Sequence, residues 1–348
     1  MRKAFFSLLA VATLASCTQT ELMTTDNEKV EVKLTSTVAD IEVGTRTPVA
    51  GVSSLVTNVL LSKVTGDYYT PANLLYNGIM TFTNGTTSTS FDTPQYYPAD
   101  GSTVYLCGLY PSTSWVMSTV AATTANYTFD GKTDVMAAAE KSSVKSDGQA
   151  GGTPKQLEFN HLLTNVIVKA VVDTDGGKVP AAKVQEVWGN IKTIVLSEAG
   201  GSATLKSKVT VGLKAGTAPT ASAFATGTAT NFYKASGAAA PYTYTDNLFS
   251  SASIAIPTTE AAIAYSMVAP IVVDGGAGKN EFKLKITTDK QSTAKELSID
   301  LTKDSGVTTD DMQGRQCVIT LKFKATEIKA TASVNVWDNG GTSSVPVE

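Results

Sequence analysis

The fold is decided by the stretch Leu157-Glu158-Phe159-Asn160-His161 and the run Val166-Ile167-Val168-Lys169-Ala170-Val171-Val172 that follows it. In the second run every second residue from Val166 onward is apolar, whereas Lys169 points the other way. A period of two is typical of a half-buried β-strand, because successive side chains of a strand point to opposite faces. The stretch therefore predicts two consecutive strands.

The same alternation recurs along the chain about every eight to twelve residues, which is the spacing of β-sandwich proteins. Turn sequences such as Asn84-Gly85 and Asp130-Gly131 separate the runs. No helical period of apolar residues persists beyond about three turns. The predicted fold class is all-β, with further strands at residues 30–34, 55–61, 79–82, 103–106, 191–196, 203–213, 254–256, 263–273, 281–287, 296–301, 316–323 and 326–337.

Two segments do not fit this pattern. Residues 134–141 suggest one short helix, and residues 137–154 are small, polar and glycine-containing, as expected of a domain boundary near residue 155. Residues 214–240 are rich in Ala, Thr and Gly, so we expect an extended surface loop there. The 348 residues suffice for two cores of about 100–200 residues each.

The start of the chain has the layout of an export signal. Met1-Arg2-Lys3 is basic, an apolar run follows, and Leu14-Ala15-Ser16-Cys17 ends it with small residues before a single cysteine. Residues 1–16 are thus a predicted lipoprotein signal peptide, and Cys17 is the predicted lipidation site. A buried cysteine at a helix end is the alternative. A run this short cannot cross a bilayer, which takes about 20 residues.

Composition and motifs argue against several functions. The net charge of −3 and the lack of Lys/Arg clusters argue against nucleic acid as a partner. His161 is the only histidine and is best explained as a structural residue, which leaves neither a catalytic triad nor a zinc site. Val273-Asp274-Gly275-Gly276-Ala277-Gly278-Lys279 lacks the spacing of a phosphate loop. We therefore predict no catalytic residue, no metal site and no cofactor.

Three features leave alternatives open. Cys107 and Cys317 could form a disulfide or lie buried as free thiols. Asp173-Thr174-Asp175-Gly176 could bind calcium, but it lacks the later ligands of a calcium loop and has ordinary turn chemistry. Five aromatic residues could line a sugar site or fill a core: Tyr96, Tyr97, Tyr105, Tyr110 and Trp115.

The two ends of the chain look complementary. Residues 30–43 are strand-like and precede Gly44-Thr45-Arg46-Thr47-Pro48, a stretch with the small residues that proteases favour. At the other end, Val334 and Val336 alternate with polar residues, and beyond a Gly-rich hinge the chain finishes in Ser344-Val345-Pro346-Val347-Glu348. Such a tail could add to another sheet as an extra strand.

In this order, the features resemble those of the fimbrillins, subunits of the protease-assembled fimbriae of Bacteroidetes-type bacteria. The resemblance covers the whole chain. It rests on Leu14-Ala15-Ser16-Cys17, Gly44-Thr45-Arg46-Thr47, the strands from Phe159-Asn160-His161 to Ala170, and Val334-Asn335-Val336-Trp337. It implies two transthyretin-like β-sandwich domains in tandem, export as an outer-membrane lipoprotein, and a cell-surface fimbria as the final location.

The resemblance also assigns the segments. Residues 1–16 would be the signal peptide, 17–46 a propeptide with the removable strand 30–43, 47–155 and 156–331 the two domains, and 332–348 the donor tail. Cys17 would be lipidated, and an arginine-specific protease would cut between Arg46 and Thr47. Removal of strand 30–43 would open a groove in the first domain. This groove would then receive Val334, Val336, Val345 and Val347 of another copy or of a related subunit.

One residue departs from this pattern, because Pro346 cannot donate a ladder hydrogen bond and must lie at an edge or an end. Two other functions remain open at this point. The first is an anchor or tip accessory subunit of the same kind of fimbria. The second is a surface glycan-binding lipoprotein that uses the aromatic residues. The fimbrial subunit of the main interpretation would support adhesion, with host or bacterial surface ligands as further partners.

Overall fold

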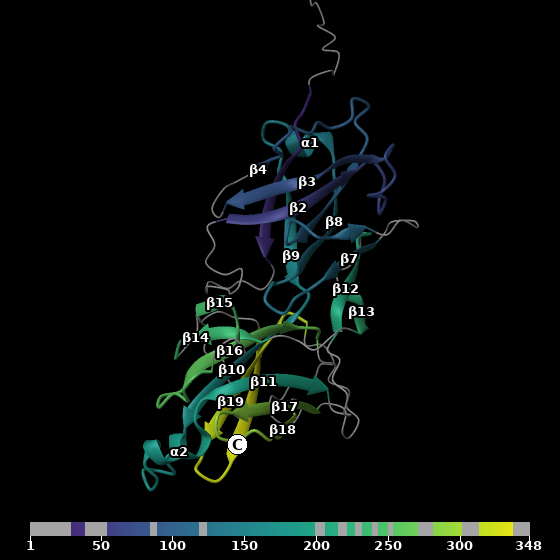
Figure 1. Cartoon of the computed structure of the whole chain (residues 1–348). Coiled ribbons are helices and arrows are strands. Elements are labelled where there is room, and N and C mark those ends of the chain that lie inside the picture. Colours follow the sequence, from purple (N-terminus) through teal and green to yellow (C-terminus); the bar gives the residue numbers. More distant parts are fainter. Residues whose placement is uncertain are drawn as a thin grey trace, which may run out of the picture.

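Strands dominate the secondary structure of the computed structural model, which confirms the predicted all-β class (Figure 1). It describes residues 29–38, 54–83, 89–117, 124–198, 206–214, 221–226, 232–238, 243–249, 253–270, 281–300 and 313–336. None of the helices in these ranges is long and apolar enough to cross a membrane.

Seven strands from the first part of the chain form one sheet in the order β3-β2-β5-β8-β9-β1-β4. Alternating apolar residues of these strands point inward and form a core. The buried members of this core run along the sequence from Val32 to Phe159. The strands are β1 (Lys33–Val38), β2 (Ser54–Ser62), β3 (Leu74–Thr83), β4 (Thr89–Ser90), β5 (Val104–Tyr110), β8 (Met136–Ser143) and β9 (Lys155–His161).

The second part of the chain forms a sandwich of two sheets, ordered β15-β14-β16-β10-β19-β20 and β11-β17-β18, around a second core. Helix α2 (Ala181–Trp188) places Val184 and Trp188 in this core. The strands are β10 (Thr164–Val172), β11 (Ile191–Glu198), β14 (Tyr233–Ser236), β15 (Thr243–Leu248), β16 (Ala261–Val268), β17 (Glu281–Thr288), β18 (Lys295–Asp300), β19 (Arg315–Phe323) and β20 (Ile328–Val336).

A fourth sheet joins strands from both sides of residue 155. Its order is β13-β12-β7-β6, with β6 (Val116–Met117), β7 (Thr124–Thr128), β12 (Lys206–Gly212) and β13 (Ala221–Thr226). Lys208 to Gly212 of β12 pair antiparallel with Thr128 to Thr124 of β7. A third core beneath these strands likewise includes residues from both halves, such as Leu109 and Tyr265. The division into residues 47–155 and 156–331 stays a prediction.

The predicted helix at residues 134–141 is wrong, because most of this segment belongs to β8, which pairs with β5 on one side and β9 on the other. Ala137 and Ala138 favour a helix intrinsically, but both are buried and paired, and tertiary context overrides such weak preferences. The four-residue helix α1 (Lys145–Gly148) begins only after β8.

The predicted loop at residues 214–240 is also wrong in part. It contains β13, which pairs with β12, and β14, which pairs with β15 and β16. Phe232 and Tyr233 are buried and provide the apolar anchor that holds β14. Residues 254–256 form a single bridge, from Ile254 to Ile191, and no longer strand.

Candidate functional site

The site of interest is the place that β1 occupies in the seven-stranded sheet. Leu34 to Val38 of β1 pair in parallel with Lys155 to Phe159 of β9. On its other side, Lys33 and Leu34 pair antiparallel with the two residues of β4. A segment close to the start of the chain therefore lies between two strands that come much later, and it completes the sheet at this point (Figure 1).

The residues just before β1 continue this arrangement. The Val32 N–H donates to the Gln95 carbonyl at 2.8 Å, and the Tyr97 N–H donates to the Val30 carbonyl at 3.0 Å. These two bonds frame a bridge between Glu31 and Tyr96. The ammonium of Lys29 lies 5.7 Å from the centre of the Tyr96 ring. We call the place of residues 29–38, bounded by β9, β4 and residues 95–97, the β1 slot.

The side chains that fill the β1 slot are apolar and buried. Val32 and Leu34 have no solvent-exposed area, and they belong to the same core as Leu157 and Phe159. Lys33 lies between them in sequence and Thr35 follows them. Both alternate to the outer face and are half-buried. Loss of this segment would leave unpaired backbone groups along β9 and an apolar groove where Val32 and Leu34 lay.

Helix α1 covers one end of the slot and is held in place by Asp147. Its carboxylate accepts hydrogen bonds from the Val144 N–H at 2.8 Å and the Ser143 hydroxyl at 3.0 Å, and it lies 3.3 Å from the Lys155 ammonium. Partial burial raises the pKa of Asp147, but the hydrogen bonds and Lys155 outweigh it, so the net pKa lies below its usual range. The Tyr97 hydroxyl joins this network through Ser143 at 2.6 Å.

Most of the residues predicted for processing and assembly lie outside the described residues: Cys17, Arg46, Thr47, Val345 and Val347. Val334 and Val336 lie in β20, an edge strand of the six-stranded sheet, opposite Cys317 and Arg315 of β19. Within the chain, β20 is therefore paired in the six-stranded sheet, whereas β1 occupies the slot in the seven-stranded sheet.

The remaining candidate residues have structural positions. His161 Nδ1 lies 2.8 Å from the Asp134 carboxylate, and both side chains are buried. Cys107 and Cys317 are free thiols in different cores, and burial raises the pKa of Cys317 to about 12. Such thiols are poor nucleophiles and poor metal ligands.

The five aromatic residues do not form one surface. Tyr97 and Tyr110 contact the core of the seven-stranded sheet, whereas Tyr105 and Trp115 contact the core shared by the two halves. Of the five, Tyr96 alone is among the exposed large apolar side chains of the described chain. This distribution matches core filling rather than a sugar platform.

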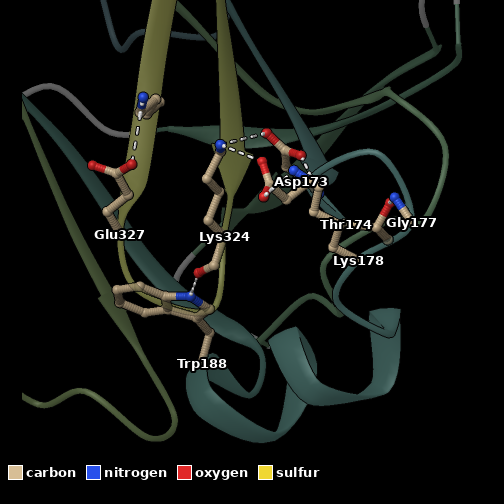
Figure 2. Close-up of polar contacts among 9 residues, drawn as sticks. Asp173, Thr174, Gly177, Lys178, Trp188, Lys324 and Glu327 are labelled. Atoms are coloured by element: carbon tan, nitrogen blue, oxygen red, sulfur yellow. Dashed lines mark hydrogen bonds and ion pairs between the residues drawn. The ribbon is translucent and has the colours of Figure 1, made fainter.

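The Asp173–Asp175 turn already has a cationic partner in Lys324 (Figure 2). The Lys324 ammonium lies 3.3 Å from an Asp175 oxygen and 3.8 Å from an Asp173 oxygen, and these carboxylates raise its pKa. The Trp188 indole N–H donates to the Lys324 carbonyl at 2.5 Å and fixes the end of β19 on α2. In the described part of the chain, no three His, Cys, Asp or Glu side chains gather as they would around a metal ion.

Sequence patterns indicated that residues 30–34 form a strand, but they did not identify Tyr97, Asp147 or Gly148 as its neighbours. The signal available was the turn-like Lys145-Ser146-Asp147-Gly148, which carries no information on what it contacts. Long-range contacts of this kind follow from topology alone.

The fold and the slot define a class of all-β proteins in which a strand from the start of the chain completes a sheet. A model of the fimbrillin-like family matches residues 57–337, and the chain therefore belongs to this family. The matched range includes β9, β4, residues 95–97 and α1, which surround the slot, but not β1 itself.

The solved structures to which this chain is similar include proteins of Bacteroides and Porphyromonas species. A candidate cell adhesion protein from Bacteroides uniformis aligns with a TM-score of 0.52 at 15% identity, over 89% of this chain and 98% of that one. A fimbrial protein from Bacteroides vulgatus aligns with a TM-score of 0.42 at 14% identity, over 88% of this chain and 99% of that one. The tip fimbrial protein Mfa3 from Porphyromonas gingivalis, truncated at its C-terminus, aligns with a TM-score of 0.38 at 11% identity, over 89% of this chain and 100% of that one. No curated protein matches this chain.

Family membership supports a role as a fimbrial subunit at the cell surface, in assembly with other fimbrial subunits. The family is one of structural proteins of fimbriae.

Proposed function

We propose that this protein is a polymerising fimbrial subunit that is exported as a lipoprotein through Cys17, matured by cleavage after Arg46, and joined to its neighbours by strand exchange in the β1 slot. The observation that carries the proposal is the position of β1, an N-terminal segment buried between β9 and β4. An arginine-specific protease and the outer membrane are the partners of the precursor. Other subunits are the partners of the mature form.

The energy for exchange comes from the emptied slot. Burial of Val32 and Leu34 stabilises the precursor by about 1.5–3 kcal/mol for each side chain. Each buried backbone group left unpaired along β9 would cost a further 1–3 kcal/mol or so. An incoming strand with apolar residues at every second position would recover most of this free energy, so the neighbour's strand is bound strongly without a covalent link.

The C-terminal tail supplies the incoming strand in this proposal. Val334 and Val336 are paired with β19 of their own chain, so the part that leaves the subunit lies beyond β20. Val345 and Val347 are spaced by two, like Val32 and Leu34. An anchor or tip subunit would instead keep its N-terminal segment or lack a free tail.

Replacement of Arg46 with alanine tests maturation. We expect a longer monomer that retains residues 17–46 and does not polymerise, because β1 stays covalently attached and occupies the slot. In wild-type filaments the N-terminal residue of the subunit, determined by sequencing, should be Thr47. Filaments of normal number that start at Cys17 would contradict the proposal and favour an anchor-type subunit.

Replacement of Cys17 with alanine tests export. We expect loss of fatty-acid attachment and of signal-peptide removal by the lipoprotein route, because the thiol is the proposed attachment point. Incorporation of a radiolabelled fatty acid into wild-type and Cys17→Ala protein measures this directly. Equal labelling of the two proteins would show that Cys17 is not the lipidated residue.

A further inference from the structure

Gly148, the last residue of α1, lies in close contact with the segment in the β1 slot. A Cβ atom on Gly148 would lie 2.5 Å from the Glu31 carbonyl oxygen, 2.7 Å from Tyr97 Cε2 and 2.9 Å from Val30 Cγ1. The nearest of these atoms belongs to the backbone, so it cannot move aside by a change of rotamer. The slot is therefore only as wide at this end as a glycine allows.

Contacts of Asp147 hold the α1 turn in place beside the slot. Asp147 ties it to Ser143, Val144 and Lys155, as described above. The segment is also held against residues 95–97 by the hydrogen bonds of Val30 and Val32. The backbone at Glu31 is thus paired with Tyr96 and lies directly against Gly148.

We infer that Gly148 is a specificity-determining residue of the β1 slot. It restricts this end to an extended strand whose backbone contacts the glycine directly and whose side chain at the position of Val30 is no larger than valine. The inference rests on the proposed exchange of strands in the slot. It applies first to the chain's own residues 29–32 and then to any strand of a neighbouring subunit that replaces them.

Hydrogen exchange on the full chain tests the first part. In Gly148→Ala, the amides of Val32 and Tyr97 should exchange at least about tenfold faster, because overpacking by one methyl group displaces the backbone that both bonds need. The Leu162 amide, which donates to the Val135 carbonyl at the far end of β9, should be unaffected. Uniformly faster exchange at all three amides would indicate general destabilisation and overturn the inference.

Two further variants complete this test. Gly212→Ala is the matched control, because a Cβ atom there has no other atom within 4 Å, and it should leave the Val32 and Tyr97 amides unchanged. Val30→Phe should reproduce the effect of Gly148→Ala from the opposite side of the contact. Unchanged exchange in both Gly148→Ala and Val30→Phe would show that this end of the slot is not selective.

Filament assembly tests the second part. Gly148→Ala subunits should form markedly fewer filaments than Gly212→Ala subunits, because their slot no longer admits a neighbour's strand. If Gly148→Ala assembles normally while Arg46→Ala does not, the proposed function stands and the inference is overturned. If Arg46→Ala also assembles normally, the strand exchange itself is refuted.

Discussion

Replacement of Leu34 with aspartate is expected to lower the free energy of unfolding of the precursor by at least about 4 kcal/mol. Leu34 has no exposed area and lies in the core of the seven-stranded sheet. The change removes a buried leucine, which alone costs about 2–5 kcal/mol, and places an unpaired carboxylate in an apolar site. Denaturant unfolding of the purified precursor measures the loss.

The matched control is Thr35→Asp, which introduces the same charge one residue later on the outer face. It should cost less than about 1 kcal/mol, since the new carboxylate stays in contact with water. A cost similar to that of Leu34→Asp would mean that β1 does not have the orientation described.

The same variant separates precursor from filament. If β1 is removed during maturation, filaments assembled from Leu34→Asp subunits should resist denaturant as well as wild-type filaments do, because residue 34 is no longer present. Weakened filaments would show that β1 stays in the mature subunit, which would contradict strand removal.

Deletion of residues 341–348 is expected to abolish filaments, or shorten them severely, while each monomer remains folded. The deleted residues lie beyond β20, which ends at Val336, so the described sheets keep all their strands. Without the tail, an emptied slot stays unfilled at a cost of several kcal/mol or so. Electron microscopy of filaments, together with thermal melting of the monomer, checks both halves of the prediction.

Paired substitutions sharpen this test. Val345→Asp with Val347→Asp should reproduce the deletion, whereas Thr342→Asp with Ser344→Asp adds the same charge on the other face of the strand and should assemble nearly normally. Filaments of normal length from the truncated protein would place the donor strand elsewhere in the chain.

The alternating pattern predicts the fold class and most strands correctly, because a strand that is buried on one face must repeat its apolar residues every second position. The runs at residues 55–61, 166–172 and 316–323 correspond to β2, β10 and β19. The short α2 was not predicted, because only Val184 and Trp188 of its residues are buried.

The errors occur where side chains carry little information. Residues 221–226, Ala-Ser-Ala-Phe-Ala-Thr, have few large apolar groups and resemble a loop, yet they form β13 because β12 offers a free edge for backbone pairing. At β8, the run of alanines is compatible with helix or strand, and the two neighbouring strands decide.

The slot was predictable only in part. Alternation of Val30, Val32 and Leu34 indicates a half-buried strand. Its parallel partner β9 lies more than a hundred residues away in sequence, and no local pattern encodes that pairing. The contact of Gly148 with Glu31 depends on the same long-range arrangement.

The antiparallel ladder between β7 and β12 has a mechanical consequence. Strand β9 leads almost directly into β10, so the covalent chain is one connection between the seven-stranded and six-stranded sheets. The ladder from Thr124–Thr128 to Lys206–Gly212, within the four-stranded sheet, is a second connection between the two halves of the chain. Separation of the two halves must therefore break this row of hydrogen bonds and uncover the core beneath it, so the joint resists opening more than a single-strand hinge would.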